Sequence, residues 1–539
     1  MLSSEKSEQS IDVNVITQYS DHIPDFYRRF ECGDTYVPEM LEDELPYWKS
    51  RNPVMIVAGT GKRKTTFVYE KVIPRAIEQG KNVLLVGNRT ALLTQMKQAL
   101  AEIVGFEEFA WLNEIGQQKI EIMGPVAAIT YHRLPAFLND PKNKGWLENV
   151  GYMVADEAHF FAADSSFNEK CGFFLKLLTR NFCKAVRIYM TATPWDIYYP
   201  LAEAEKRNSN RREEYFQPWQ PSRAFYLYHF TADYHHVNLK FFDHLKEIKE
   251  MIEESSEKWL VFVDNKTKGA EFANGLGDRA IYLDADNKQS EDWHCLLKES
   301  RFDSQVLVTT AVLDCGVNII DPALRSIVIV SDNRTSLLQM LGRKRHKPGE
   351  RVNLYVCDIS MKKISSRQQD CAELCEWYDR YLNSTDVERK AMARELWHEP
   401  REMLRHYFDL TTNGYLVPNR IAFFALERRR RFYEKIQSGA TTFRQEVQCW
   451  LGLEAEPEAD PEEQLLRFCE ANLDRELDED EIMPLRKLIV ATAKCYGYIE
   501  QQPRRVDSLG REALNNRLAY FNCPFELAKT AWTIQKSSG

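Results

Sequence analysis

Short apolar runs recur along the first two thirds of the chain, separated by longer amphipathic stretches. A first series comprises Val54–Val57, Asn82–Val86, Ala127–Thr130, Tyr152–Ala155 and Arg187–Met190. Runs of this length with little polar alternation are typical of strands that are covered on both faces. Helical connections between such strands predict a parallel α/β sheet. We therefore expect an α/β domain between Pro53 and Pro194.

A second series of the same kind follows. Its runs are Trp259–Val263, Ala280–Asp284, Val306–Thr310, Ser326–Val330 and Asn353–Cys357. Beyond Ser360 the strand pattern gives way to helical periodicity. The expected fold class is α/β, with two tandem RecA-like parallel-sheet domains followed by a mostly helical C-terminal region.

Changes in composition divide the chain further. The stretch from Trp195 to Pro221 is polar and contains prolines, which is typical of a connection between domains. The expected parts are a polar or helical N-terminal extension (1–44), a first sheet domain (45–200), an inter-domain connection (201–221), a second sheet domain (222–362), a helical accessory region (363–453), an acidic linker or solvated helix face (454–482) and a small basic module, helical or winged (483–539).

The net charge of -9 is concentrated in one segment. Residues 454–481 hold 13 acidic and 2 basic side chains, a local net of -11, which leaves +2 for the remainder. The overall sign therefore does not exclude a nucleic-acid partner. The 12 cysteines include no C-x-x-C pair, so we expect neither disulfides nor a structural metal. No apolar run approaches the length of a spanning helix, so we expect a cytoplasmic protein without a membrane partner.

The stretch VAGTGKRKTTFV, residues 57–68, has the layout of a phosphate-binding loop. A strand, a turn and a Lys-Thr pair opening a helix let backbone N–H groups hold phosphate oxygens. In this interpretation Lys64 reaches the β and γ phosphates of ATP and the Thr65 hydroxyl ligates Mg²⁺. The strict glycine pattern fails at Ala58 and Arg63, and a basic surface turn is the alternative when the loop is taken alone.

An acidic pair follows a buried-strand run about ninety residues downstream of the loop. Two carboxylates at the C-terminal end of a strand suit metal chemistry. Asp156 is expected to hold Mg²⁺ through water, and Glu157 to position and deprotonate an attacking water. A lone acidic pair is usually a solvated turn, but its place after a candidate phosphate loop favours the functional interpretation.

Together these residues resemble the superfamily 2 helicases and translocases, specifically the DEAH-type group with two RecA-like domains. The resemblance covers roughly Pro53–Asp358 and rests on an ordered series of motifs. In the loop, Ala58, Thr60, Gly61, Lys64 and Thr65 fit the family pattern and Arg63 departs from it. The sequence DEAH at 156–159 fits motif II, which includes His159. Thr191, Ala192 and Thr193 fit motif III, which in the family couples nucleotide state to the nucleic-acid track.

The resemblance continues in the second domain. VLVTTAVLDCGVNI looks like motif V, which implies Thr310 on the nucleic-acid side and Gly316 to Asn318 near the nucleotide. QMLGRKRH looks like motif VI, with Gln339, Gly342 and Arg343 in place. Family members carry a second arginine at the position of His346, whereas this chain has Arg345 one residue earlier. An arginine from a second domain makes hydrolysis depend on domain closure.

The family places nucleic-acid contacts on loops at the strand ends. GNRTALLTQM resembles motif Ia and puts Asn88 and Arg89 near a backbone phosphate; ITYHRL resembles motif Ib and offers Thr130, with His132 a further candidate. The Thr90 and Thr130 hydroxyls would equally suit strand-to-helix caps. Contacts of this kind go to phosphate and sugar, so little sequence preference is expected.

Four consecutive arginines, Arg428–Arg431, stand in the accessory region. Consecutive residues point around a helix, so we expect at least one to pair with Glu427 or Glu434. A solvated helix face is the favoured interpretation and a phosphate-contacting patch is the second. The C-terminal region is a candidate for contact with a protein partner.

The sequence thus predicts an enzyme: an ATP-dependent nucleic-acid helicase or translocase that needs ATP and Mg²⁺. Resemblance to DNA-translocating relatives favours DNA over RNA and suggests a bacterial, phage or mobile-element type. One alternative is a duplex translocase that does not separate strands. Another is a nucleic-acid-binding or scaffold protein whose ATPase is weak or lost, because Arg63 occupies a position where glycine lets the backbone approach phosphate.

Overall fold

The structure is a computed structural model that describes residues 27–88, 90–165, 170–209, 225–287, 290–313, 317–347, 349–398, 404, 407–410, 416–453, 461–495, 506 and 509–537. The chain forms two compact units, Met1–Gly452 and Leu453–Gly539, each described by itself below. Within these ranges no helix is long and apolar enough to cross a membrane.

The first sheet belongs to the larger unit and has the strand order β1-β8-β2-β7-β6-β3-β5-β4. All neighbours are parallel except β4 and β5. The strands are β1 (Tyr27–Gly33), β2 (Val54–Val57), β3 (Asn82–Gly87), β4 (Ile122–Met123), β5 (Val126–Thr130), β6 (Val150–Ala155), β7 (Val186–Thr191) and β8 (Phe225–Phe230). The five expected strands of this domain are confirmed, with small shifts at their ends.

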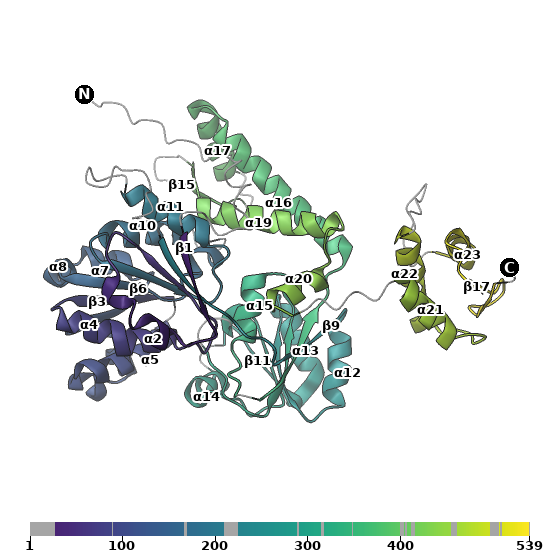
Figure 1. Cartoon of the computed structure of the whole chain (residues 1–539), viewed down its shortest axis with the longest axis horizontal. Helices are drawn as coiled ribbons and strands as arrows, with labels where there is room; N and C mark the ends of the chain where they lie inside the picture. The colour runs from purple at the N-terminus through teal and green to yellow at the C-terminus, as the bar shows by residue number, and fades with distance from the viewer. Residues whose placement is uncertain are drawn as a thin grey trace. The chain divides into compact units, whose positions relative to one another are not determined.

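Helices cover both faces of this sheet, which explains why its strands lack polar alternation. Val54 and Ile56 of β2 pack into one core, and Met55 and Val57 pack into another on the opposite face. The first core is covered by α4 (Ile73–Glu78) and α5 (Thr90–Val104), and the second by α7 (Leu134–Asn139), α10 (Cys171–Asn181) and α11 (Tyr198–Ser209). Figure 1 shows α10 and α11 above the sheet and α4 and α5 below it.

Three expected boundaries of this domain need correction. The sequence predicts an extension over 1–44, yet β1 and α2 (Val37–Leu41) lie in this range, and β1 pairs with β8 in the first sheet. It predicts the second domain from 222, yet β8 also pairs with β2. It predicts a connection over 201–221, yet α11 packs on the first domain through a buried Arg187–Glu205 ion pair of 2.7 Å. Edge strands with polar side chains and a charged helix give weak sequence signals, and their partners are distant in the chain.

The second sheet has the order β11-β12-β10-β13-β14-β9, with all neighbours parallel. Its strands are β9 (Val237–Phe242), β10 (Lys258–Phe262), β11 (Ala280–Leu283), β12 (Val306–Thr309), β13 (Leu324–Ile329) and β14 (Val352–Cys357). The five expected strands are confirmed. The sequence pattern did not predict β9, an edge strand whose middle residues are partly or fully exposed.

Two long helices and a hairpin follow the second sheet. They are α16 (Met361–Leu382), α17 (Asp386–His398), β15 (Phe408–Leu410) with β16 (Leu416–Pro418), α19 (Arg420–Gln437) and α20 (Phe443–Trp450). Helix α19 packs along α16, and its first turns reach the first domain, where Phe424 stacks on Tyr199 at 5.3 Å between ring centroids. The expected helical accessory region therefore holds both helices and a short hairpin.

The second unit contains α21 (Pro461–Ala471), α22 (Glu479–Cys495), α23 (Arg511–Tyr520), β17 (Phe525–Leu527) and β18 (Ile534–Lys536). Its core includes Leu465 and Cys469 of α21. The expected acidic linker to 482 is therefore corrected, because α21 and the start of α22 are part of the folded unit. Isolated backbone bridges join Leu473 to Ile534 and Glu476 to Thr533 beside this hairpin.

Candidate functional site

The expected nucleotide motifs of the first domain meet at one edge of its sheet. The loop 58–63 follows β2, Thr191 ends β7, and Asp156 follows β6. These strands are adjacent in the order β2-β7-β6 and run parallel, so their carboxyl ends lie side by side. This edge is where open α/β sheets bind ligands.

The phosphate loop contains a strained residue at the position that departs from the family pattern. Arg63 has φ 62° and ψ 33°, a left-handed conformation, and is the residue before α3 (Lys64–Phe67). Such a conformation costs a non-glycine residue about 1 kcal/mol. The Arg63 side chain points out of the loop, with nitrogen–oxygen distances of 3.8 Å to Glu39 and 3.5 Å to Glu70. The backbone therefore keeps the shape that glycine usually provides there, while the side chain is held outside.

Lys64 points into the loop. Its Nζ donates to the carbonyl oxygens of Ala58 at 2.7 Å and Gly59 at 3.1 Å. Burial lowers the pKa of Lys64, and the carboxylates of Glu157 and Asp156 oppose that shift. The amine therefore lies between the loop and the acidic pair, a position from which it can bind a phosphate group.

The acidic pair forms a tight turn after β6. Asp156 is buried, its Oδ1 accepts from the Glu157 N–H at 3.0 Å, and Glu157 has φ 51°. Burial and the neighbouring Glu157 raise the pKa of Asp156, against the effect of Lys64. Burial would also raise the pKa of Glu157, but His159, Lys64 and Arg343 outweigh it and the pKa is lowered. Glu157 is therefore ionised at neutral pH.

One oxygen of Glu157 is available for a further partner. His159 Nδ1 lies 3.2 Å from Oε2, yet among the described residues no donor is aligned to form a hydrogen bond with this buried oxygen. An unsatisfied buried carboxylate oxygen is costly, and a water would satisfy it. The acidic pair, Lys64 and the half-buried Thr65 thus form a donor set that fits Mg²⁺ and a nucleotide phosphate.

A chain of buried polar side chains runs from this turn into the second domain. His159 Nδ1 lies 3.3 Å from Thr191 Oγ1, which accepts from the Thr193 N–H at 3.0 Å. Gln339 Nε2 donates to Thr193 Oγ1 at 3.2 Å, and Arg343 Nη2 donates to Gln339 Oε1 at 3.0 Å. All five residues are buried. The structure therefore joins residues of motifs II, III and VI by direct contacts.

The phosphate loop also touches the second domain. A Cβ added at Gly342 would lie 2.7 Å from Thr60 Cγ2 and 2.9 Å from Thr60 Oγ1. A side chain at 342 would therefore force Thr60 or the domains to shift, and glycine fits this arrangement of the two domains without such a shift.

Arg345 and His346 are the two candidates for the second basic residue of motif VI, and their side chains point in different directions. Arg345 is half-buried, and its Nε donates to Asn318 Oδ1 at 2.9 Å. Burial and the neighbouring Arg343 lower the pKa of Arg345, and Glu157 opposes that shift. His346 is exposed and stacks on His236 with ring centroids 3.7 Å apart. Arg345 thus faces the nucleotide edge and His346 faces away. Gly316 lies outside the described residues.

One residue of this site was missed by the sequence analysis. Tyr131 is fully buried, stacks on Phe160 at 4.7 Å, and donates from its hydroxyl to the Asp156 carbonyl oxygen at 2.7 Å. It therefore fixes the backbone of the acidic turn. The sequence places Tyr131 beside Thr130, but only the tertiary contact distinguishes it from an ordinary core tyrosine.

The expected nucleic-acid residues lie at strand ends of both sheets. Asn88 follows β3 and Thr130 ends the neighbouring β5, while Thr310 follows β12. Thr130 Oγ1 accepts from the Arg133 N–H at 3.2 Å in the turn before α7, so its hydroxyl stabilises this turn and does not cap the helix. Arg89 lies outside the described residues. Of these candidates Thr310 lines a cavity, whereas Asn88 and Thr130 are not among its lining residues.

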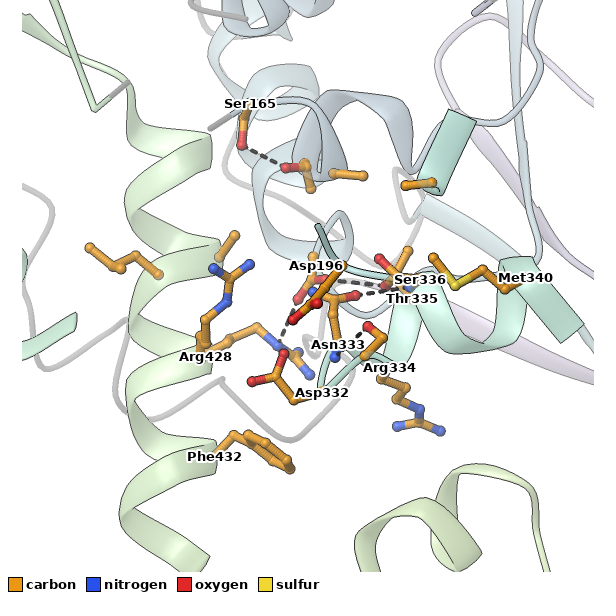
Figure 2. Close-up of a pocket in the computed structure, with 18 of the residues that line it drawn as sticks. Ser165, Asp196, Asp332, Asn333, Arg334, Thr335, Ser336, Met340, Arg428 and Phe432 are labelled. Carbon is orange, nitrogen blue, oxygen red and sulfur yellow. Dashed lines mark hydrogen bonds and ion pairs between the residues drawn. The ribbon is translucent and has the colours of Figure 1, made fainter. Parts of the chain in front are cut away.

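This cavity has a volume of about 770 Å³ and is enclosed by three parts of the larger unit. They are the strand ends of the second sheet around Asp264, Thr310 and Asp332, the Asp196 turn after motif III, and helices α19 and α20. Figure 2 shows Arg428 and Phe432 projecting from one helix towards Asp196 and Asp332. Asp196 also contacts Thr335 of α15 (Arg334–Leu341) at 3.3 Å. The cavity is thus connected to the helix that carries Gln339.

Comparison with known proteins gives one family match. Residues 14–196 match a family model described as the type III restriction enzyme, res subunit. A curated relative, the replication restart protein PriA of Rickettsia felis, is 28% identical over 157 residues, which are 27% of this chain. The match spans 22% of the length of that relative.

Solved structures with a similar arrangement include two helicases. The DUF1998 helicase MrfA bound to DNA and AMPPNP is 17% identical, with 64% of this chain and 50% of that chain covered and a TM-score of 0.44. The Mycobacterium smegmatis helicase Lhr bound to ssDNA and AMP-PNP is 14% identical, with 90% and 57% covered and a TM-score of 0.41. TM-scores this low carry no argument about function, so the resemblance to helicases rests on the family match and the order of the motifs. The family match covers residues 14–196, and together with the order of the motifs it supports the resemblance to the superfamily 2 helicases.

Proposed function

We propose that this protein is a DEAH-type motor that hydrolyses ATP with Mg²⁺ between its two sheet domains and thereby moves along nucleic acid. The observation that carries the proposal is the chain of contacts from the acidic turn to Arg343. It connects the group that would activate water, Glu157, to an arginine of the other domain. Hydrolysis and domain arrangement are therefore mechanically linked.

In the first domain each residue has a distinct task. The backbone of Thr60 and Gly61 and the Lys64 amine bind phosphate oxygens, while Thr65 and Asp156 hold Mg²⁺. When bound, the ion would supply neutralisation of the charge that develops on the phosphates. Glu157, ionised and with one open oxygen, orients a water and takes its proton. The lowered pKa of Glu157 favours orientation of the water over strong basicity.

In the second domain Arg343 and Arg345 approach the transferred phosphoryl group, with Asn318, Gly316 and Gln339 beside the nucleotide. Delivery of these guanidinium groups requires the close contact between Gly342 and Thr60. His159, Thr191 and Thr193 transmit the nucleotide state between the domains. The geometry favours Arg345 over His346 as the second cation.

The nucleic-acid partner is proposed to be DNA in preference to RNA, bound largely without regard to sequence. Asn88, Arg89, Thr130 and Thr310 supply contacts at the strand ends. The curated relative is named a replication restart protein, and similar structures hold DNA in some cases and RNA in others. The preference for DNA rests on the motif Ia and Ib resemblance.

Steady-state ATPase activity tests the proposal. The rate is measured alone and with single-stranded DNA, duplex DNA or RNA, in the wild type and in Glu157→Gln. We expect stimulation by one polymer and a loss of about 100-fold or more in the variant. A wild-type rate no higher than that of the variant would instead support the second candidate, a binding protein with a weak ATPase, which the strained Arg63 favours.

Displacement assays then separate the two motor activities. A helicase displaces the strand of a forked duplex, whereas a duplex translocase displaces only a triplex-forming strand. Displacement of triplex alone would exclude the helicase activity and retain the motor.

A further inference from the structure

The turn at residues 195–196, directly after motif III, is held by two other parts of the larger unit. Asp196 Oδ1 lies 3.2 Å from Arg428 Nε of α19, and Asp196 Oδ2 accepts from Thr335 Oγ1 of α15 at 3.3 Å (Figure 2). The Trp195 carbonyl oxygen also accepts from Arg428, at 2.9 Å. The turn therefore joins the first domain to the helix of motif VI and to the accessory region.

The four consecutive arginines of α19 divide by their contacts. Arg430 and Arg431 bond to Glu427 on their own helix, as expected for a solvated face. Arg429 is exposed and lines the cavity. Arg428 instead reaches the first domain through the contacts given above. The favoured interpretation of a solvated face therefore holds for part of the run only, and Arg428 helps to fix the turn.

The Trp195 ring lies between the two sheet domains. It packs against the core of the first domain, and the guanidinium carbon of Arg334, the first residue of α15, lies 3.5 Å from the ring centroid. Both side chains are half-buried. A guanidinium in van der Waals contact with an indole ring is a favourable cation–π arrangement, and partial burial strengthens it. The pair therefore adds a direct attractive contact between the domains.

Arg334 depends on this ring for stabilisation of its charge. Burial lowers the pKa of Arg334 to about 10, so the guanidinium is still charged at neutral pH. Within the described residues it forms no ion pair, and its buried Nε has no hydrogen-bond partner. The nearby Asp196 carboxylate is engaged by Arg428 and Thr335. The described partner of this buried cation is therefore the face of Trp195.

Helix α15 contacts the first domain at its start, its middle and its end. Arg334 contacts the turn, Gln339 donates to Thr193 Oγ1 at 3.2 Å, and Gly342 lies against Thr60. Gln339 stands about midway between Arg334 and Arg343. A tilt of the helix about Gln339 would move its two ends in opposite directions, so a contact at the start resists displacement of Arg343.

We propose that the stack of Arg334 on Trp195 is an inter-domain contact that fixes the direction of α15 and thereby the place of Arg343 at the nucleotide. The inference rests on the proposed function, which supplies the reaction. It makes Trp195 and Arg334 positioning residues, because they act through the helix and do not touch the phosphates. Loss of the stack should therefore impair turnover more than nucleotide binding, which relies on the loop of the first domain.

Steady-state ATP turnover tests the proposal, measured with the polymer that stimulates the wild type most. Trp195→Ala and Arg334→Gln should each lower kcat about tenfold and leave KM for ATP within about twofold. Trp195→Phe keeps an aromatic face and should recover most of the rate. Trp111→Ala is the matched control, because Trp111 is a first-domain tryptophan that is 88% exposed, and it should match the wild type.

The double variant distinguishes a stack from two unrelated effects. If the two residues act on each other, Trp195→Ala combined with Arg334→Gln should lose about tenfold in kcat, as each single variant does. Independent effects would multiply to about a hundredfold loss and would overturn the inference. Melting curves verify the fold of each variant. If Trp195→Ala does not fold, Arg334→Gln with Trp195→Phe completes the same cycle.

The outcomes separate this inference from the proposed function. If the wild type turns over ATP and both single variants keep its kcat, the role of the stack is overturned and the motor stands. An equal loss in kcat and in nucleotide affinity, without recovery in Trp195→Phe, would show a general structural role and would also overturn it. If wild-type turnover is no higher than that of Glu157→Gln, the proposed function fails together with this inference.

Discussion

The phosphate loop and the acidic turn each contain one non-glycine residue in the left-handed conformation, Arg63 and Glu157. The two side chains go in opposite directions. Arg63 leaves the site for Glu39 and Glu70, which are exposed partners. Glu157 stays in the site, where His159 and Lys64 stabilise its ionised form. The same backbone strain therefore accompanies two different uses of the side chain.

This difference indicates what each strained position contributes. At position 63 the left-handed backbone conformation matters and the arginine side chain makes no contribution to the site. Glycine at this position should therefore support phosphate binding as well as arginine or better. At Glu157 the strained backbone directs a carboxylate to the place where phosphate chemistry occurs, so relief of the strain should not compensate for loss of the group. The proposed mechanism and the following predictions depend on this contrast.

The largest expected effect is that of Glu157→Gly. The change relieves the left-handed strain but removes the carboxylate, so ATP turnover should fall by about 100-fold or more. The melting temperature should change little, because relief of the strained backbone offsets the loss of the contacts that Glu157 makes with His159 and Lys64. Steady-state turnover checks the expected loss of activity, and calorimetric melting checks the expected stability. Turnover near the wild-type rate would contradict the assignment of Glu157 to the attacking water.

A smaller effect is expected where the second domain meets the phosphate loop. Gly342→Ala adds a Cβ at 2.7 Å from Thr60 Cγ2, so Thr60 or the domains must shift, and turnover should fall roughly tenfold. Thr60→Ser removes that methyl group, and the double variant should recover part of the rate. Steady-state kinetics of the four proteins provide the measurement. Equal rates in the wild type and Gly342→Ala would mean that this contact is absent during turnover.

Acidification should affect the two carboxylates of the turn differently. The pKa of Asp156 is raised by burial and by Glu157, so protons compete with Mg²⁺ for Asp156 above the ordinary carboxylate range. The pKa of Glu157 is lowered, so Glu157 remains ionised over the same range. The Mg²⁺-dependent part of ATP affinity should weaken several-fold as the pH falls from neutral to mildly acidic. Titration calorimetry with ATP, with and without Mg²⁺ at each pH, measures the Mg²⁺-dependent part of the affinity.

The variant Asp156→Asn is the control for this pH dependence. It should have little Mg²⁺-dependent affinity at any pH, because the ligand that titrates has been removed. A wild-type Mg²⁺ effect that stays constant on acidification would contradict the role given to Asp156.

The smallest expected effect is that of Arg63→Gly. Relief of about 1 kcal/mol of strain is partly offset by the greater freedom of glycine in the unfolded chain, so stability should change little. Nucleotide affinity should rise about threefold at most, because the loop then approaches phosphate more easily. Arg63→Ala is the control: it removes the ion pairs but keeps the strain, and should not gain affinity. A marked loss in Arg63→Gly would show that the arginine itself holds phosphate.

The strands of both sheets could be predicted because burial on two faces leaves a strong local signal. Each of the ten expected runs is a strand in the structure. By contrast β1, β8 and β9 were missed: β1 and β9 lie at sheet edges with exposed polar side chains, and β8 follows a long polar stretch. Their place depends on pairing with residues far away in the chain. The first domain was consequently assigned boundaries that were too narrow.

Sequence alone determined the order of the motifs and the residue types that meet at the nucleotide edge, since strand order and chain direction bring those loops together. Tertiary structure alone decided the directions of side chains. It turned Arg345 to Asn318 and His346 to His236, held Arg63 outside the loop, and left Arg429 open to the cavity. The physical reason is that local sequence fixes backbone periodicity, whereas the partner of a charged side chain is set by packing between distant segments.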